Sequence, residues 1–482
     1  MSVTPAGHIP GRKLAELLGS WSGQQRPTSQ ALFQGVKQLV LEGRLPPGTR
    51  LPAERDLAER LGVSRTLVAR SLERLREDGF AASRRGAGSW VTLPDGKLAH
   101  APHGGWYPTA SESEVIDLAQ ATPAAPPELA EATDRARLRL VEEICGHGYE
   151  PQGHLALRER IADRYAQRGL PTTPDQILVT NGAQHAFALV LHLMVSPGER
   201  VLVEHPTYPN SLEAIRGISG VPVAAPMAHD GWDLELLEAT LNQASPRLAY
   251  LIPDFQNPTG IRMEAENRAR SAAALRRAHT TAVIDETLVE VDLTGEAPPP
   301  PMASFAERNT ITVGSASKAF WGGLRLGWIR ASAELVQRMV VGRARIDLGS
   351  PVLEQLVLAE LLADPEPGLR ARRAEWAAGR DVLVAALGEH LPDWKFRIPQ
   401  GGLSLWCDVG APVGGRLAVL AEQHGVRLAS GSRFAVNGSL ESRLRLPYAL
   451  PADQLREAVR RIARASCAVG PGSPAALDCP IT

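Results

Sequence analysis

Five short apolar runs in the middle of the chain constrain its fold more than any other feature. Helical patterns separate these runs, which are QILVT (176–180), RVLVE (200–204), LAYLIP (248–253), TAVIDE (281–286) and TITVGS (310–315). Runs that are apolar throughout are typical of strands buried on both faces, and parallel neighbours need long helical connections. The sequence from Val115 onward therefore predicts an α/β domain with a parallel sheet covered by helices on both faces.

The N-terminal part of the chain is more basic than the rest. Residues 1–94 contain 14 Lys and Arg against eight Asp and Glu, although the whole chain has a formal net charge of −1. This asymmetry favours a basic head that meets a polyanion, although a chance distribution of solvated charge would also produce it. Residues 94–114 are rich in Pro, Gly, Ser and His and have no apolar period, which predicts a flexible linker. We expect a head at 27–93, the linker at 94–114, a body at 115–468 and a disordered tail at 469–482.

Cysteine spacing and hydropathy exclude several classes of protein. The four cysteines show no CxxC spacing, which argues against a disulfide framework and against a metal site of the zinc type. No run approaches the ~20 apolar residues that a membrane-spanning helix needs, and the N-terminus lacks the apolar stretch of a signal peptide. We expect a cytoplasmic protein with no metal site.

Two helical patterns joined by a tight turn predict a helix-turn-helix in the head. The segment ERDLAERL (54–61) is amphipathic, and Gly62 allows the turn that follows it. Ser64 can cap a second helix that runs from Arg65 to about Asp78. The second helix has a single apolar stripe for packing against the first, made of Val68, Leu72 and Leu75.

The polar face of the second helix and the hairpin after it carry residues suited to DNA. Thr66 and Arg70 lie opposite the apolar stripe, with Arg65 in the first turn, as in a helix that enters the major groove. Arginine there can grip guanine edges or hold phosphates. The hairpin tip that contains Arg85 and Gly86 is small and basic, which suits close approach to the DNA backbone. These arginines would otherwise be ordinary solvated surface residues.

The strongest chemical signal in the body is Ser315-Ala-Ser317-Lys318, with Arg325 seven residues later. A lysine at the end of a strand can form an imine with an aldehyde cofactor. The two serines and the arginine can surround a dianionic phosphate on that cofactor. The pattern is weak alone, because most lysines lie on the surface, and it gains weight only from agreement with other segments.

Four other segments follow apolar runs and offer groups that such a cofactor needs. Small residues that open a helix present amide N–H groups to an anion, and an aromatic ring can stack on a pyridine. An amide can donate to a phenolic oxygen, and a carboxylate can hold a ring nitrogen protonated. Each residue has an ordinary structural explanation when taken singly, but their common order and spacing favour the cofactor. In chain order they are Gly182, Ala183 and Gln184 for the anion, Tyr208 for the ring, Asn257 for the oxygen and Asp285 for the nitrogen.

The head resembles the GntR-type winged helix-turn-helix over about 65 residues, in the segments Pro47–Pro52 and Gly62–Arg65 and in the stop at Gly79. One departure is Ala53, where that family usually has a serine that forms a capping box with the acid three residues on. Losing such a cap costs roughly 1 kcal/mol. The resemblance implies double-stranded DNA as a partner and DNA contacts from Arg50, Ser64, Arg65, Thr66, Arg70, Arg85 and Gly86.

Residues ~115–465 resemble a fold-type I aminotransferase, and the order of head, linker and body resembles the MocR/GabR-type regulators. The resemblance implies pyridoxal 5′-phosphate (PLP) on Lys318, a large domain with a mostly parallel sheet and a smaller C-terminal α+β domain. It also implies a head-to-tail homodimer with composite sites. Tyr149 resembles a tyrosine that reaches the phosphate of the partner's cofactor, and Arg445 resembles the arginine that takes the α-carboxylate of an amino acid.

The chain departs from the aminotransferase pattern after Asp285. The family usually has a tyrosine two or three residues later, where this sequence has Thr287 and Leu288. Without that hydroxyl the phenolate of the cofactor is less stabilised, so we expect its internal aldimine to stay protonated to higher pH. The change also disfavours efficient transamination without excluding it.

Two functions from different classes fit these residues. In the first, an amino acid, an amine or PLP itself binds at Lys318 and changes how two heads sit on DNA. In the second, the body is a working aminotransferase and the head is a tether or autoregulator. The intact head and the missing tyrosine favour the transcription regulator. A scaffold with a decayed site is disfavoured because Lys318, Asp285, Asn257 and Arg325 are all present.

Overall fold

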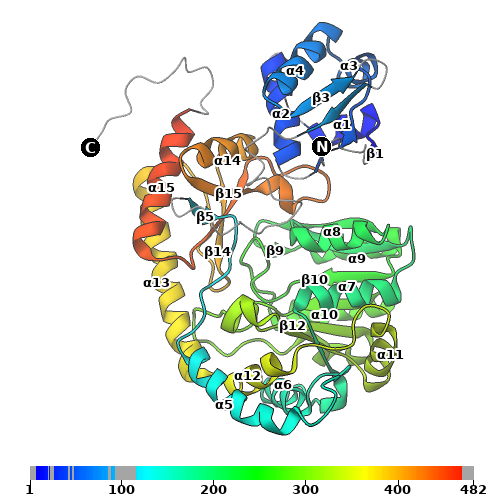
Figure 1. Ribbon diagram of the computed structural model, residues 1–482, viewed down its shortest axis with the longest axis vertical. Helices are drawn as coiled ribbons and strands as arrows, with labels where there is room; N and C mark the ends of the chain where they lie inside the picture. Colours follow the sequence, from blue (N-terminus) through cyan, green and yellow to red (C-terminus); the bar gives the residue numbers. More distant parts are fainter. Residues whose placement is uncertain are drawn as a thin grey trace.

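The computed structural model describes residues 7–19, 21, 27–41, 44–45, 48–84, 88–92 and 115–468. These residues form a small N-terminal head next to one end of a much larger body (Figure 1). The expected linker at 94–114, the expected tail at 469–482, Arg85 and Gly86 lie outside the described residues. Within the described ranges, no helix is long and apolar enough to cross a membrane.

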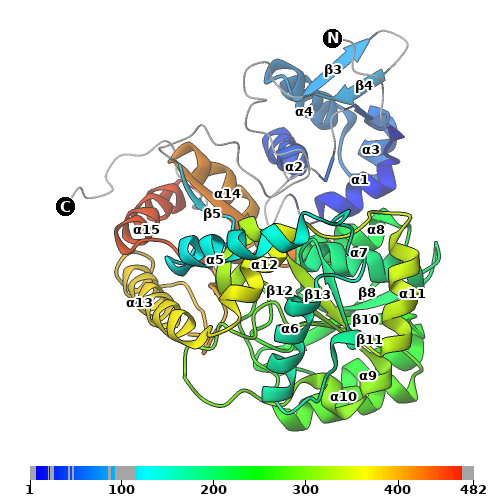
Figure 2. The same cartoon turned by 60° about the horizontal axis from the view of Figure 1, so that its bottom comes forward.

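The described residues of the head form four helices and a small sheet, which lie together at one end of the molecule (Figure 2). Its helices are α1 (Gly11–Leu18), α2 (Ser29–Leu41), α3 (Glu54–Leu61) and α4 (Arg65–Glu77). Its strands, in the order β1-β2-β4-β3, are β1 (Gly7–His8), β2 (Thr49–Arg50), β4 (Gly88–Val91) and β3 (Ala81–Arg84). The predicted helix-turn-helix and hairpin are therefore present.

The packing of the head follows from its apolar pattern. The predicted stripe of α4 is buried, and its residues Val68, Leu72 and Leu75 share a core with Ile9, Leu14 and Leu18. Ile9 directly follows β1, and Leu14 and Leu18 lie on α1. The head therefore includes a segment before residue 27 that the sequence pattern did not indicate.

The turn between α3 and α4 is built as its residues suggest. Gly62 adopts the left-handed conformation (φ 65°), and the Ser64 side chain accepts a hydrogen bond from the Leu67 amide. Ala53 occupies the N-cap of α3 and supplies no side-chain bond. Asp56 instead accepts a hydrogen bond from the Gly11 amide at 3.0 Å, so it ties the start of α1 to α3.

The large domain of the body is built on an eight-stranded sheet in the order β6-β13-β12-β11-β10-β7-β8-β9. All five apolar runs form strands of this sheet. Neighbours from β12 to β8 are parallel, whereas β13 is antiparallel to both its neighbours and β9 is antiparallel to β8. The strands are β6 (Ile177–Thr180), β7 (Arg200–His205), β8 (Val221–Ala228), β9 (Gly231–Trp232), β10 (Leu248–Leu251), β11 (Thr281–Asp285), β12 (Thr310–Ser315) and β13 (Gly327–Arg330).

Helices cover both faces of this sheet, as alternate residues of β10 illustrate. Leu248 and Tyr250 share a core with α7 and α8, whereas Ala249 and Leu251 share one with α9 and α10. The covering helices are α5 (Glu128–Glu143), α6 (Leu155–Gln167), α7 (Ala183–Met194), α8 (Pro209–Gly217), α9 (Leu234–Ala244), α10 (Ala265–Arg277), α11 (Ala333–Arg343) and α12 (Val352–Leu361).

The small domain contains both the first strand of the body, β5, and its last helix, α15. Its sheet has the order β14-β16-β15-β5, with β14 (Ser404–Asp408), β16 (Arg443–Pro447), β15 (Val426–Ser430) and β5 (Ile116–Leu118). Its helices are α13 (Glu366–His390), α14 (Gly414–Gln423) and α15 (Ala452–Cys467). Because β5 pairs with β15, the segment that follows β5 enters the space between the two domains.

Candidate functional site

A cavity of about 540 Å³ lies between the large sheet and the small domain. It opens at the carboxyl ends of the parallel strands, because Asp285 ends β11 and Ser315 ends β12. This edge is where open α/β sheets bind ligands. The predicted residues that line it are Gly182, Ala183, Gln184, Tyr208, Asn257, Asp285, Ser315, Ser317, Lys318, Arg325 and Arg445.

Lys318 lies in one π-helical turn, Ser317–Trp321, directly after β12. Its Nζ donates to the Ala121 carbonyl at 2.9 Å and lies 3.4 Å from Thr122 Oγ1. Burial, together with the charge of Arg445, lowers the pKa of Lys318 from 10.5 to about 8, although Asp285 opposes this. A substantial neutral fraction is therefore present near pH 8, which a nucleophilic amine requires.

One end of the cavity is a cradle for an anion. Gly182 is the N-cap of α7 with a φ of 87°, so the first amides of the helix face the cavity. The Arg325 guanidinium donates to the Asn181 carbonyl. It also lies close to Gly182, because a Cβ added to Gly182 would be 3.2 Å from the guanidinium. The hydroxyls of Ser315 and Ser317, which also line the cavity, are hydrogen-bonded to each other. Helix amides, two hydroxyls and a guanidinium fit a dianionic phosphate.

The carboxylate of Asp285 is fixed by two donors. Its Oδ2 accepts a hydrogen bond from Tyr250 Oη at 2.5 Å, and its Oδ1 accepts one from the Thr287 amide at 2.8 Å. Burial and the neighbouring Asp285 raise the pKa of Tyr250 well above 10, so Tyr250 stays a proton donor. The sequence did not indicate Tyr250, because a tyrosine in a buried strand is an ordinary core residue.

Arg445 is buried where the two domains meet. One terminal nitrogen donates to Asn257 Oδ1 at 3.3 Å, and the other donates to the Ala119 carbonyl. Its guanidinium also lies 5.2 Å from the centre of the Phe434 ring. Burial lowers the pKa of Arg445 to about 10, so it remains a cation at neutral pH.

The segment Ala119–Thr122 contacts two of the cations that line the cavity, Lys318 and Arg445. Its carbonyls accept from Arg445 and from Lys318, and it comes directly after β5. A ligand that binds Lys318 and Arg445 would compete with this segment for their N–H groups. Sequence analysis missed it, because a backbone carbonyl has no residue type that could reveal it.

Gln256 connects the two loops that carry Tyr208 and Asn257. Its amide nitrogen donates to the Pro206 carbonyl and to Glu204, and its amide oxygen accepts from Thr259. Burial raises the pKa of Glu204 to about 7. This buried network holds the loops of Tyr208 and Asn257 in one arrangement, which the sequence did not indicate either.

Thr287 and Leu288 line the cavity, so no tyrosine hydroxyl stands where the aminotransferase pattern has one. Tyr149 does not line it; it is 58% exposed and lies beside His147. A contact of Tyr149 with a cofactor would therefore have to be made in another copy of the chain.

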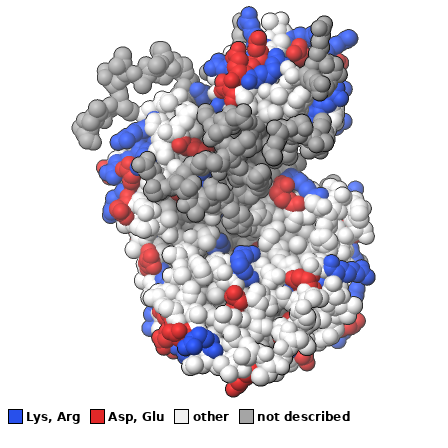
Figure 3. Space-filling model, in the orientation of Figure 1, with Lys and Arg blue, Asp and Glu red and all other residues white. Residues whose placement is uncertain are grey.

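The predicted DNA contacts on α4 are accessible. Arg65, Thr66 and Arg70 are exposed, and so is Arg50 on β2, whose guanidinium lies near Gly88 of the hairpin. Lys and Arg side chains are frequent on the head, with Asp and Glu among them (Figure 3). The structure thus places these residues on one accessible unit, as a DNA-binding surface requires.

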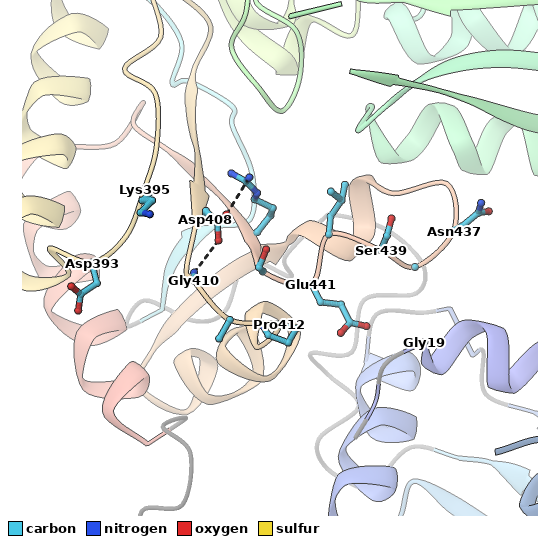
Figure 4. A pocket seen from close by; sticks show the side chains of 14 residues that line it. Gly19, Asp393, Lys395, Asp408, Gly410, Pro412, Asn437, Ser439 and Glu441 are labelled. Atoms are coloured by element: carbon cyan, nitrogen blue, oxygen red, sulfur yellow. Dashed lines mark hydrogen bonds and ion pairs between the residues drawn. The ribbon is translucent and has the colours of Figure 1, made fainter. Parts of the chain in front are cut away.

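A second cleft lies where the head meets the small domain (Figure 4). It measures about 860 Å³ and is lined by Gly19 of the head and by segments of the small domain between 393 and 443. Its charged side chains include Asp408, which lies 3.2 Å from Arg443, and Glu441. None of the predicted cofactor residues lines it.

Comparisons with known proteins match both parts of the chain. A family model described as aminotransferase class I and II matches residues 113–462, and one described as bacterial regulatory proteins, gntR family, matches residues 28–91. The chain is 28% identical to the probable rhizopine catabolism regulatory protein MocR of Rhizobium meliloti, over 76% of this chain and 78% of that protein. It is 32% identical to a 2-aminoadipate transaminase of Thermus thermophilus, over 70% and 85%.

Among solved structures, the fold is similar to LysN, an α-aminoadipate aminotransferase of Thermus thermophilus in complex with N-(5′-phosphopyridoxyl)-L-leucine. The TM-score is 0.68 at 30% identity, and the match covers 74% of this chain and 93% of that chain. The match covers the greater part of the chain, as expected for the body alone.

Proposed function

The chain belongs to the class I and II aminotransferase family and carries a gntR-type domain in front of it, and on this premise we propose that it is a PLP-dependent transcription regulator that senses an amino compound. The observation that supports the sensing site most is Lys318, an amine of lowered pKa in a cavity with an anion cradle and a second buried cation, Arg445.

The residues of the cavity fit PLP group by group. When bound, PLP supplies an aldehyde that an amine can join and a ring that withdraws electrons. Its phosphate would be held at the α7 N-terminus by the two serines and Arg325. Asp285, fixed by Tyr250, would hold the ring nitrogen protonated, and Asn257 would donate to the phenolic oxygen. Tyr208 would stack on the ring.

The effector would bind between the two domains. Arg445 would take a carboxylate, and Lys318 would exchange its place on the cofactor for the amine of the effector. The effector would then compete with the carbonyls of Ala119 and Ala121 for Arg445 and Lys318, so it would change contacts on the segment at the start of the body. Such a ligand is a regulator only if it binds two states with different affinity.

We further propose that the chain forms a homodimer through an apolar flank of the body. The exposed apolar side chains of this flank form two groups. The first lies on α5 and just after it, and the second lies on α11 and in the segment that follows it. The second group lies beside Tyr149, because a Cβ on Gly349 would be 2.8 Å from the Glu150 carbonyl. Such exposure marks contact sites. The residues are Leu138, Val141, Ile144, Val341, Ile346 and Leu348.

The dimer proposal is tested by light scattering of purified protein. Ile144→Lys places a charge on the proposed interface and should shift the mass from two chains toward one. Ile398→Lys is the control, because Ile398 is also exposed and its neighbour Pro399 packs against Gly260, which belongs to neither α5 nor α11. Equal masses for both variants would contradict the proposed interface.

Absorbance and DNA binding test the sensor. Wild-type protein with PLP should show a visible band that Lys318→Ala abolishes and that the exposed control Lys395→Ala retains. An amino compound should shift this band and change the mobility of a DNA fragment from upstream of the gene. Arg65→Ala or Arg70→Ala should weaken DNA binding, whereas Arg12→Ala on α1 should not. A protein with no visible band would contradict the proposal.

A working aminotransferase is the second candidate. It is supported by the presence of Lys318, Asp285, Asn257 and Arg325 in one cavity. In that case an amino acid would remove the visible band, and a 2-oxo acid would restore it over many turnovers. A band that shifts and then persists favours the sensor.

A further inference from the structure

Asn181 connects the anion cradle to a cluster of charged side chains behind it. Its backbone carbonyl accepts a hydrogen bond from the Arg325 guanidinium at 3.2 Å. Asn181 itself is not among the described residues that line the cavity. Its side-chain amide instead donates to Asp347 Oδ2 at 3.0 Å, on the segment that follows α11. The contact of Asn181 with the site therefore comes from its main chain, and its side chain points to Asp347.

Two side chains hold Asn181 in place. His185 Nδ1 accepts a hydrogen bond from the Asn181 amide N–H at 3.0 Å, and His185 Nε2 lies 3.5 Å from Asp347 Oδ2. Burial lowers the pKa of His185 below its usual 6.5, although Asp347 opposes this, so the neutral ring can accept at neutral pH. Asp347 in turn accepts hydrogen bonds from the Arg343 guanidinium and from the Gly349 amide. These bonds leave the Asn181 peptide little freedom to turn.

Arg343 anchors this cluster to the large sheet. Its side chain is fully buried, and it donates to the carbonyls of Pro151 and Val179 as well as to Asp347. A buried guanidinium needs such partners, because an unpaired buried charge is costly. Val179 lies on β6, the strand that leads to Asn181. Asp347 therefore has a fixed position relative to the strand that leads into the cradle.

The Arg325 side chain gains from this support. A long side chain loses rotamer freedom when it binds a phosphate, and this loss weakens binding. A guanidinium that a fixed carbonyl already holds has lost part of that freedom before the ligand arrives. Arg325 also has a left-handed backbone with a φ of 53°, a conformation that surrounding contacts must maintain. Both features indicate that the position of Arg325 is set before a ligand binds.

We propose that Asn181 and Asp347 are positioning residues for the phosphate of the cofactor, and that they act through Arg325. This inference rests on the proposed function, because it takes PLP as the ligand. Neither side chain would touch the phosphate; together they hold the carbonyl that orients the guanidinium. Loss of the Asn181 side chain should therefore weaken the binding of the phosphate group and leave the binding of the ring unchanged.

The test compares PLP with pyridoxal, which lacks the phosphate. Each is titrated against the full chain, and its dissociation constant is taken from the visible band. Asn181→Ala should weaken PLP binding about tenfold, as expected for a loosened hydrogen bond to a charged group, and pyridoxal binding less than about twofold. Equal losses for the two ligands, or no loss for PLP, would overturn the inference. A wild-type protein that forms no band with PLP would instead contradict the proposed function.

Asn309→Ala is the matched control. Asn309 also donates one side-chain hydrogen bond, to the Thr280 carbonyl at 2.9 Å, but it precedes β12 at the end away from the cavity. Both alanine variants should lose a similar amount of thermal stability, whereas only Asn181→Ala should lose PLP affinity. The phosphorus-31 NMR shift of bound PLP gives a second readout, which Asn181→Ala should move toward that of free PLP. A shift identical to that of the wild type would contradict the positioning role.

A pair of variants tests Asp347 itself. Asp347→Asn keeps an oxygen that can accept from the Asn181 amide, and Asp347→Ala does not. Only Asp347→Ala should therefore reproduce the selective loss of PLP affinity over pyridoxal affinity. Equal PLP affinity in these two variants would overturn the role of Asp347.

Discussion

Replacing Lys318 with methionine should stabilise the empty protein at neutral pH. The Lys318 amine lies inside the cavity near Arg445, and its pKa falls from 10.5 to about 8. The folded state therefore holds this ammonium at a cost that the unfolded chain does not have. Methionine has a similar length and no charge, so it removes that cost.

The magnitude follows from the pKa change. A fall from 10.5 to about 8 corresponds to roughly 3.5 kcal/mol at about 1.4 kcal/mol per pKa unit. Lys318 is only half-buried, water in the empty cavity screens its charge, and methionine loses the hydrogen bond to Ala121. These terms reduce the expected gain in the free energy of unfolding to about 1 kcal/mol.

The gain should depend on pH with a definite sign. Below pH 8 both folded and unfolded chains carry the proton, so the full cost of the buried charge is present. Between pH 8 and 10.5 the folded state has lost the proton while the unfolded chain keeps it, so the cost declines as pH rises. The advantage of methionine should be largest near pH 7 and vanish by about pH 10.5.

Thermal unfolding of PLP-free protein at pH 7 and pH 9.5 measures this effect. Lys395→Met, at an exposed position, is the matched control and should show no such pH dependence. Added PLP should reverse the order, because only the wild type can join it covalently. A variant that is less stable than the wild type at pH 7, or a difference that does not change with pH, would refute the reasoning.

Three further substitutions have expected outcomes. Ala53→Ser adds the missing cap of α3 and should raise the unfolding free energy of the head by about 1 kcal/mol in chemical denaturation. Gly182→Ala combines a strained φ of 87° with a contact against Arg325, so PLP affinity measured by fluorescence should fall at least about tenfold. Tyr250→Phe removes a donor from buried Asp285; thermal unfolding should show a loss of roughly 1.5–3 kcal/mol, and a neutral effect would contradict the hydrogen bond.

Much of the fold could be predicted from local patterns. The runs that became β10, β11 and β12 are apolar because both faces of the sheet are covered, and that requirement is visible in the residues themselves. The same holds for α3 and α4, where Gly62 and Ser64 have the conformation and the capping bond that their residue types favour. Lys318 and Asp285 could be located because strand ends that meet at one edge of a parallel sheet bring their residues together.

The sequence by itself thus determined the helix-turn-helix, the order of the main strands and many of the side chains that reach the cavity, because spacing and residue type carry that information. Only the tertiary structure decided how these side chains are held. Lys318 is bonded to Ala121, 197 residues away, and Arg445 to Ala119, both through backbone carbonyls that are the same in every residue. Likewise, Asp56 bonds to Gly11 rather than completing a cap. Such contacts depend on where distant segments meet in space, and no local pattern records that.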